Sequence, residues 1–245
     1  MPVNNPIIAI PAEVRNQVAD SDYVLMIDSD GMLYQVSKVD FFLSNLPIYI
    51  NLPLIETTGT IARDISGNDL NATYINVLNN SDGKVFDGTG RISLNDSINA
   101  LSILSIEIEF KSSSNSNQGL WEFRASQDLS SGTYTPSLIM SPNGQLSVYG
   151  YPSGSGYASR KHLDGTFDAY NDGNWHKSIV VMSNNNIKIF VDKVKILDVN
   201  ANPITPFSGF FSIGSTRANG NWIGQLKNFK VRNIALTDVQ AISLS

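Results

Sequence analysis

The chain has 245 residues, 42 % of them hydrophobic and 16 % charged, which is enough apolar material for one large domain with a small appendage. Its formal net charge of -5 argues against a protein that follows nucleic-acid phosphates, because such proteins carry a basic stripe. The chain contains no cysteine, which excludes disulfides and thiolate metal sites, and no stretch approaches the roughly 18 apolar residues of a membrane span.

The first part of the chain differs in character from the rest. Residues 1–19 are punctuated by Asn and Pro and are expected to form an extended arm. Residues 20–47 predict a small ββα module, in which two apolar segments flank a turn that ends in Gly31 and apolar residues at helical spacing follow over 39–46. A unit of about 25 residues is too small to bury its apolar face alone, so we expect it to dock on the main domain, a sister subunit or another protein.

From residue 48 onward the informative segments have the pattern of strands. Residues 104–110 alternate strictly between apolar and polar side chains, which predicts a half-buried strand. Residues 178–182 form a continuous apolar run, as expected of a strand that is covered on both faces. Residues 187–191 alternate again after an Asn-rich turn, which favours a hairpin.

The end of the chain carries two further signals. Leu226 and Phe229 both look like core residues although their positions have opposite parity, which predicts a β-bulge between them. Thr237 and Gln240 form a capping-box pattern, which predicts one closing helical turn. Many short strands, frequent turns and no long helical period together predict an all-β sandwich over 48–245.

Four segments, in order, resemble the laminin-G-like jelly-roll domains that share the concanavalin A-like fold. The resemblance covers about four-fifths of the chain, and its strongest part is the D-G-x-W-H pattern followed by an alternating strand that ends in V-D. It implies a concanavalin A-like β-sandwich jelly roll. The segments are 52–68 (LPLIETTGTIARDISGN), 85–92 (VFDGTGRI), 172–192 (beginning DGNWHK and ending IKIFVD) and 224–237 (GQLKNFKVRNIALT).

Residues 20–46 resemble a module near the N-termini of phage tail-fibre and head-decoration proteins. The likeness is carried by residues 22–28 (DYVLMID) and 33–42 (LYQVSKVDFF). It implies a virion accessory protein that is assembled in the host cytoplasm, that contacts other virion proteins through residues 1–47 and that forms a homo-oligomer, commonly a trimer. A cysteine-free chain fits that origin, and it fits an ordinary cytosolic protein equally well.

A glycan hydrolase of the same fold is the natural enzyme hypothesis, and we rank it last. Glu107 and Glu109 share one strand face about 7 Å apart, a spacing that would not exclude an inverting pair. They lack a third acidic residue on the strand, so we expect a solvated face and no catalytic residues. Trp175 is expected to pack in the core, and His176 shows no partner that would make it catalytic.

Calcium is considered because lectin-like sandwiches often hold it with loop oxygens. The candidate ligands are Asp168 and Asp172, with Asp64, Asn68 and Asp69 as a second group. The alternative is that these residues simply form Asx turns. The chain also departs from the family pattern: Lys227-Asn228 replaces an acidic pair, which weakens a calcium site there, and Lys193 replaces a turn glycine.

The best candidate for ligand binding is aromatic. Along residues 146–151 Leu146 and Val148 face one way, whereas Tyr149 and Tyr151 face the other and form a platform on which a sugar ring could stack. Tyr157 follows in a Gly-rich loop, and Trp222 is expected to rim a cleft. The alternative is that these rings fill a second core layer or a trimer contact.

The leading hypothesis is therefore a non-enzymatic phage fibre or capsid-decoration subunit whose jelly roll attaches to glycans or to the host surface. The rival hypothesis is a purely structural decoration or spacer protein without a ligand. No cofactor is required by either hypothesis. The two differ in whether the tyrosine face is open or packed.

Overall fold

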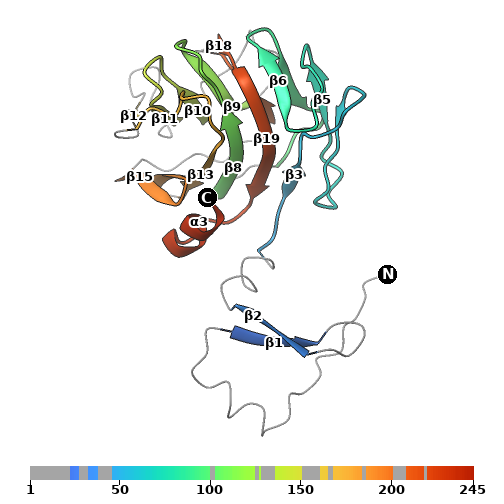
Figure 1. Ribbon diagram of the computed structural model, residues 1–245, viewed down its shortest axis with the longest axis vertical. Coiled ribbons are helices and arrows are strands. Elements are labelled where there is room, and N and C mark those ends of the chain that lie inside the picture. The colour runs from blue at the N-terminus through green and yellow to red at the C-terminus, as the bar shows by residue number, and fades with distance from the viewer. Residues whose placement is uncertain are drawn as a thin grey trace, which may run out of the picture. The chain divides into compact units, whose positions relative to one another are not determined.

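The computed structural model describes residues 23–27, 33–37, 46–99, 103–124, 127, 136–150, 161–164, 168–183, 186–200, 208–217 and 220–245. The chain divides into two units, Met1–Leu46 and Pro47–Ser245. In the first unit, β1 (Tyr23–Ile27) pairs antiparallel with β2 (Leu33–Ser37), which confirms the predicted hairpin (Figure 1). The expected arm over 1–19 and, apart from Leu46, the expected helix over 39–46 lie outside the described residues.

The second unit is a sandwich of two antiparallel sheets. Of the strands in the described residues, eight form one sheet, in the order β12-β11-β10-β9-β16-β7-β5-β4. The bounds in that order are Lys161–Asp164, Leu146–Gly150, Ser137–Met140, Gln118–Arg124, Phe210–Ile213, Arg91–Leu94, Ala72–Ile75 and Ile61–Ala62.

The described part of the facing sheet has seven strands, in the order β15-β14-β13-β8-β19-β3 with β6 also paired to β19 (Figure 1). Their bounds are Val194–Asn200 (β15), Asn186–Val191 (β14), His176–Met182 (β13), Leu104–Lys111 (β8), Ile223–Arg232 (β19), Ile50–Leu52 (β3) and Lys84–Asp87 (β6). A short hairpin of β17 (Ser215–Thr216) and β18 (Gly220–Asn221) completes the unit. This architecture confirms the predicted all-β jelly roll.

The core lies between the two sheets because alternate residues of every strand point inward. In the eight-stranded sheet, successive cross-strand partners from Val148 through Leu138, Trp121, Ile213 and Ile92 all belong to this core. Burial of such side chains stabilises by about 1.5–3 kcal/mol each relative to exposure. On β8 the apolar residues of the predicted alternation face inward, but Ser105 and Glu107 on the outward face are also buried, so the strand is not half-buried as predicted.

The longest strand, β19, carries the bulge that the sequence predicted. Its pairing with β8 shifts register between Lys227 and Lys230, and Asn228 has a left-handed φ of 53°. The extra residue allows both Leu226 and Phe229 to be fully buried despite their opposite parity.

The chain ends in a helix, α3 (Asp238–Leu244), that contacts β13 and β15. Its predicted capping box is confirmed: the hydroxyl of Thr237 accepts from Gln240 N, and Thr237 N donates to the Gln240 side chain. On β13, Val180 belongs to the main core, and its neighbour Ile179 is buried as well although it points the other way. The predicted double coverage of this strand is thus confirmed. Among the described residues, no helix is long and apolar enough to cross a membrane.

Candidate functional site: a groove on the outer face of the seven-stranded sheet

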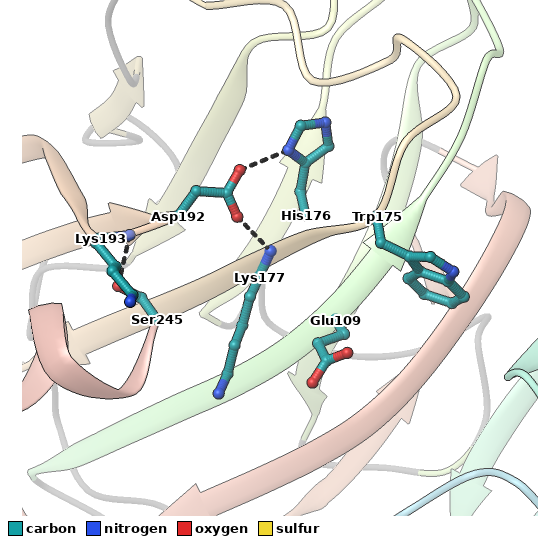
Figure 2. Close-up of a pocket in the computed structure, with 7 residues that line it drawn as sticks. All are labelled: Glu109, Trp175, His176, Lys177, Asp192, Lys193 and Ser245. Atoms are coloured by element: carbon teal, nitrogen blue, oxygen red, sulfur yellow. Dashed lines mark hydrogen bonds and ion pairs between the residues drawn. The ribbon is translucent and has the colours of Figure 1, made fainter.

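A groove of about 380 Å³ lies on the face of the seven-stranded sheet that points away from the core, and it is open to solvent (Figure 2). Strand alternation places its floor there. Ile108 and Phe110 enter the core, so Glu109 between them faces outward, and Lys177 of β13 is its cross-strand partner. The lining residues are Glu109, Trp175, His176, Lys177, Asp192, Lys193 and Ser245.

One wall of the groove is the tight turn between β14 and β15. Asp192 and Lys193 both have left-handed backbones, with φ of 47° and 69°. The Asp192 carboxylate holds the turn in place, since it accepts a 2.9 Å hydrogen bond from Lys177 N, and Lys193 N donates to Ser245 Oγ at 3.0 Å. A non-glycine residue is strained in this conformation, and glycine would relieve the strain. The chain therefore keeps a lysine at the groove at a cost in stability.

His176 links this turn to the loop before β13. Its Nδ1 lies 2.6 Å from Asp192 Oδ2 and its Nε2 lies 3.0 Å from Asp172 Oδ1 (Figure 2 shows the Asp192 contact). Burial lowers the pKa of His176, but the hydrogen bonds to the two carboxylates and their charges outweigh burial and raise the pKa above its usual value. The imidazolium form, which can donate from both ring nitrogens, is thus favoured. Sequence reasoning missed both partners: Asp192 is 16 residues away, and Asp172, only four residues away, was considered as a calcium ligand.

The Asp172 carboxylate that faces His176 is held in place by further hydrogen bonds. Hydrogen bonds from the backbone and side chain of Asn174, together with the one from His176, lower the pKa of Asp172 to about 2. The imidazole ring packs edge-on against Tyr170, with ring centroids 5.2 Å apart. Because both ring nitrogens are hydrogen-bonded to carboxylates, His176 connects two loops and is poorly placed to act as a general base.

Trp175 lies at the far end of the groove and is partly exposed, so its predicted core position is wrong. Its Nε1 donates to Asp82 Oδ2 at 3.4 Å, and Lys227 Nζ lies 4.0 Å from the ring centroid. Lys227 also bonds Asp82 at 3.0 Å. The lysine that replaces a family acidic residue thus orients the indole by a cation–π contact.

The two glutamates of β8 have different environments, which corrects the expected solvated face. Glu107 is 1 % exposed and bonds Lys177 and Arg232 at 2.9 Å and Lys230 at 3.1 Å. Burial raises its pKa, but the three cations outweigh burial and lower it. The side chain of Glu109 is 23 % exposed and accepts from Asn228. A hydrolase acid needs a raised pKa, which Glu107 does not have.

With this geometry in view, comparison with known proteins identifies the family. The family model described as the concanavalin A-like lectin/glucanases superfamily matches residues 86–241. The chain belongs to this superfamily. The laminin-G-like resemblance is thereby confirmed, whereas the resemblance of the N-terminal module to phage proteins stays a prediction. The search among curated proteins found no match.

Solved structures with the same fold include several lectin-like domains. A native heptameric SAP-like pentraxin from Limulus polyphemus matches with a TM-score of 0.51 and 16 % identity, over 65 % of this chain and 79 % of that one. The binding domain of botulinum neurotoxin DC, in complex with SialylT, matches with a TM-score of 0.56 and 14 % identity, over 81 % of this chain and 50 % of that one. Domain 4 of AbnA, an arabinanase of Geobacillus stearothermophilus, in complex with arabinotriose, matches with a TM-score of 0.50 and 18 % identity, over 80 % of this chain and 85 % of that one. At these identities the likeness shows the fold.

The structure describes both groups of residues that were predicted as calcium ligands. Asp168 is exposed, and both oxygens of Asp172 are already engaged by Asn174 and His176. Among the residues that the structure describes, no group of three or more His, Cys, Asp or Glu side chains could hold a metal ion. In the second predicted group, Asp64 accepts from Ser66 N two residues on, the Asx turn given as the alternative. Calcium binding stays an unsupported prediction.

The predicted aromatic platform of this superfamily member is described only in part. Leu146 and Val148 are fully buried, as expected, and the backbone of Tyr149 belongs to β11. The side chain of Tyr149, together with Tyr151 and Tyr157, lies outside the described residues.

Trp222 requires a correction because it does not rim a cleft. Its side chain is 0 % exposed and packs edge-on against Phe110 in the core, with ring centroids 5.9 Å apart. Backbone hydrogen bonds to Gly88 and Gly214 hold the segment between the sheets.

Proposed function

We propose that the jelly roll is a non-enzymatic carbohydrate-binding domain and that the groove at Trp175 contacts the sugar. The observation that carries the proposal is an open groove that combines a partly exposed indole with carboxylate, ammonium and hydroxyl groups. Sugars present apolar C–H faces that pack on aromatic rings, and hydroxyls that pair with such polar groups.

The state of Lys193 supports a functional role for the groove. Its side chain is exposed at the rim although its backbone has a φ of 69°, where glycine would be more stable. Strain that is kept at a surface position favours a role for the side chain. Two structures that share the fold were solved as complexes, the botulinum toxin domain with SialylT and the AbnA domain with arabinotriose. These ligands support carbohydrate as the ligand class.

The proposal includes no chemical step. Glu107 is paired with three cations and His176 is held between two aspartates, so neither is arranged as an acid or a nucleophile. We further propose, from the resemblance of residues 20–46 alone, that the domain is displayed on a phage virion as a fibre or decoration subunit. Electron microscopy of host-grown particles labelled with an antibody against the chain tests that part, and unlabelled particles would contradict it.

Carbohydrate binding is tested with the full chain on a glycan panel, with Trp175→Ala and Lys193→Gly as variants. Lys193→Gly removes the ammonium group and leaves a backbone that glycine adopts without strain. Val239→Ala, an exposed position on α3, is the control. Specific binding that both groove variants weaken and the control retains supports the proposal. Binding that is equal in all three variants would place the sugar elsewhere, and no binding at all would favour the structural spacer.

A further inference from the structure

Three residues outside the groove contact the indole of Trp175, namely Asp82, Gly83 and Lys227. The ring Nε1 donates to Asp82 Oδ2 at 3.4 Å, and Lys227 Nζ lies 4.0 Å from the ring centroid. None of the three belongs to the lining of the groove, which includes Trp175 itself (Figure 2). The contacts that fix the ring are therefore made away from the space that a ligand would occupy.

Gly83 makes room for the ring. A Cβ atom at this position would lie 2.9 Å from Cη2 and 3.3 Å from Cζ2 of Trp175, and 3.1 Å from the carbonyl oxygen of Leu226. Its φ of 114° favours glycine as well. Leu226 pairs with Lys84 in the ladder between β19 and β6, so the sheet fixes the backbone next to Gly83. One edge of the indole thus rests against a backbone that the sheet holds in place.

An ion pair joins the two other contacts of the indole. Lys227 Nζ bonds Asp82 Oδ1 at 3.0 Å, while Asp82 Oδ2 accepts from Trp175. The backbone N–H of Asp82 donates to Asn80 Oδ1 at 2.9 Å, an Asx turn that shapes the segment before Gly83. The hydrogen bond from Lys227 and its charge lower the pKa of Asp82, so the carboxylate is ionised at neutral pH.

This ion pair has more consequence for the ring than for stability. The side chain of Asp82 is 66 % exposed, and an ion pair with an exposed member contributes little to the free energy of unfolding. The ammonium group of Lys227 covers one face of the indole and leaves the other face for stacking. The ring has therefore lost much of its rotational freedom before a ligand arrives.

We propose that these three residues position the Trp175 indole, so that the groove presents one face of the ring to the sugar in a fixed orientation. Lys227 occupies one face, and the apolar face of a sugar packs on the opposite one. A side chain that is ordered in advance does not have to be ordered on binding, so the positioning residues raise the affinity without contacting the sugar. This role rests on the proposed carbohydrate-binding function of the groove.

Two measurements test the positioning role. One is titration of the full chain with the member of a glycan panel, containing arabinotriose and lactose, that binds most tightly. The other is acrylamide quenching of tryptophan fluorescence without glycan, which reports mainly on Trp175 because Trp121 and Trp222 are 0 % exposed. Lys227→Met should weaken glycan binding by about three- to tenfold and increase the quenching. Lys227→Arg keeps a cation over the ring and should restore both values.

Lys195→Met is the matched control for the loss of a lysine. Lys195 is a partly exposed residue of β15 whose ion-pair partners are Asp198 and Asp238, so its loss should change neither measurement. In a chain that already carries Trp175→Ala, Lys227→Met should have no further effect on binding, because the lysine acts only through the ring.

Gly83→Ala provides a second, independent variant. Its new Cβ would displace the indole, so binding should weaken and the quenching should change. Gly59→Ala is its control, because Gly59 also has a left-handed φ but has open space around it. It should leave both measurements unchanged.

Three results would overturn the positioning role. Binding that Trp175→Ala weakens but that Lys227→Met leaves unchanged would overturn it while the proposed function stands. An equal loss from Lys227→Met in the presence and in the absence of the Trp175 ring would show a direct contact with the sugar instead. A natural chain that binds no glycan of the panel would overturn the proposed function, and the positioning role with it.

Discussion

Replacement of Glu107 by glutamine should destabilise the jelly roll far more than the same change at Glu109. Glu107 is 1 % exposed and is the shared partner of Lys177, Lys230 and Arg232. The side chains of the two lysines are 27 % and 25 % exposed and can turn to water, whereas that of Arg232 is 4 % exposed and would keep an uncompensated charge. Breaking one partner of a buried pair costs about 3–5 kcal/mol, and we expect about 3 kcal/mol for Glu107→Gln.

Glu109→Gln is the matched control on the same strand. Its ion pair with Lys227 is 3.9 Å long and partly exposed, and glutamine can still accept from Asn228. The expected cost is below about 1 kcal/mol. Urea denaturation of the full chain at pH 7, followed by circular dichroism, measures both free energies of unfolding. Equal costs for the two variants would refute the account of this network.

The pH dependence provides a second check on Glu107. Its pKa in the folded state is below the ordinary 4.5, so its ionised form contributes stability above that value and the contribution is lost as the pH falls through the folded pKa. The stability gap between the natural protein and Glu107→Gln should therefore be full at pH 7 and should narrow on acidification below about pH 4.5. A gap that stays constant down to pH 2 would contradict the charge argument.

Three further predictions concern single positions. Lys193→Gly should raise the free energy of unfolding by about 0.5–1 kcal/mol, measured by urea denaturation, because glycine adopts the φ of 69° freely. Because the pKa of His176 is raised in the folded state, its contribution to the free energy of unfolding is complete below the ordinary pKa of 6.5 and is lost as the pH rises through the folded pKa. The free energy of unfolding should therefore fall as the pH rises from 6.5 through the folded pKa in the natural protein, and it should stay flat in His176→Gln. Gly214→Ala should cost about 3 kcal/mol or more, because its new Cβ would lie 2.3 Å from Phe86 at a φ of 74°. Gly59→Ala, with open space and a φ of 86°, should cost about 1–2 kcal/mol, and urea denaturation measures both costs.

The fold could be predicted because its signals are local. The strand over 104–110, the apolar run over 178–182 and the capping box at Thr237 each depend on neighbouring residues, and the structure confirms these three elements. The half-burial expected of the first strand is wrong, because Ser105 and Glu107 on its outward face are buried as well. Even the bulge in β19 could be inferred, since Leu226 and Phe229 had to share a core from positions of opposite parity.

The site could not be predicted to the same extent because it is assembled from distant segments. Glu107 meets Lys230 and Arg232 across more than 120 residues of sequence, so alternation alone placed it on a solvated face. His176 finds Asp192 across a hairpin. Trp222 illustrates the converse, because a turn-rich, polar flank suggested exposure whereas tertiary packing buries the ring.

Carbohydrate binding by the domain is measured by titration of the full chain with the glycans that a panel selects, in parallel with Trp175→Ala and Val239→Ala. We expect saturable binding that Val239→Ala retains and that Trp175→Ala weakens by about tenfold, the value expected when an aromatic contact of about 1–1.5 kcal/mol is lost. Two results would contradict carbohydrate binding at the groove. One is a folded chain that binds no glycan, and the other is a Trp175→Ala variant that binds the selected glycan as tightly as the natural protein does.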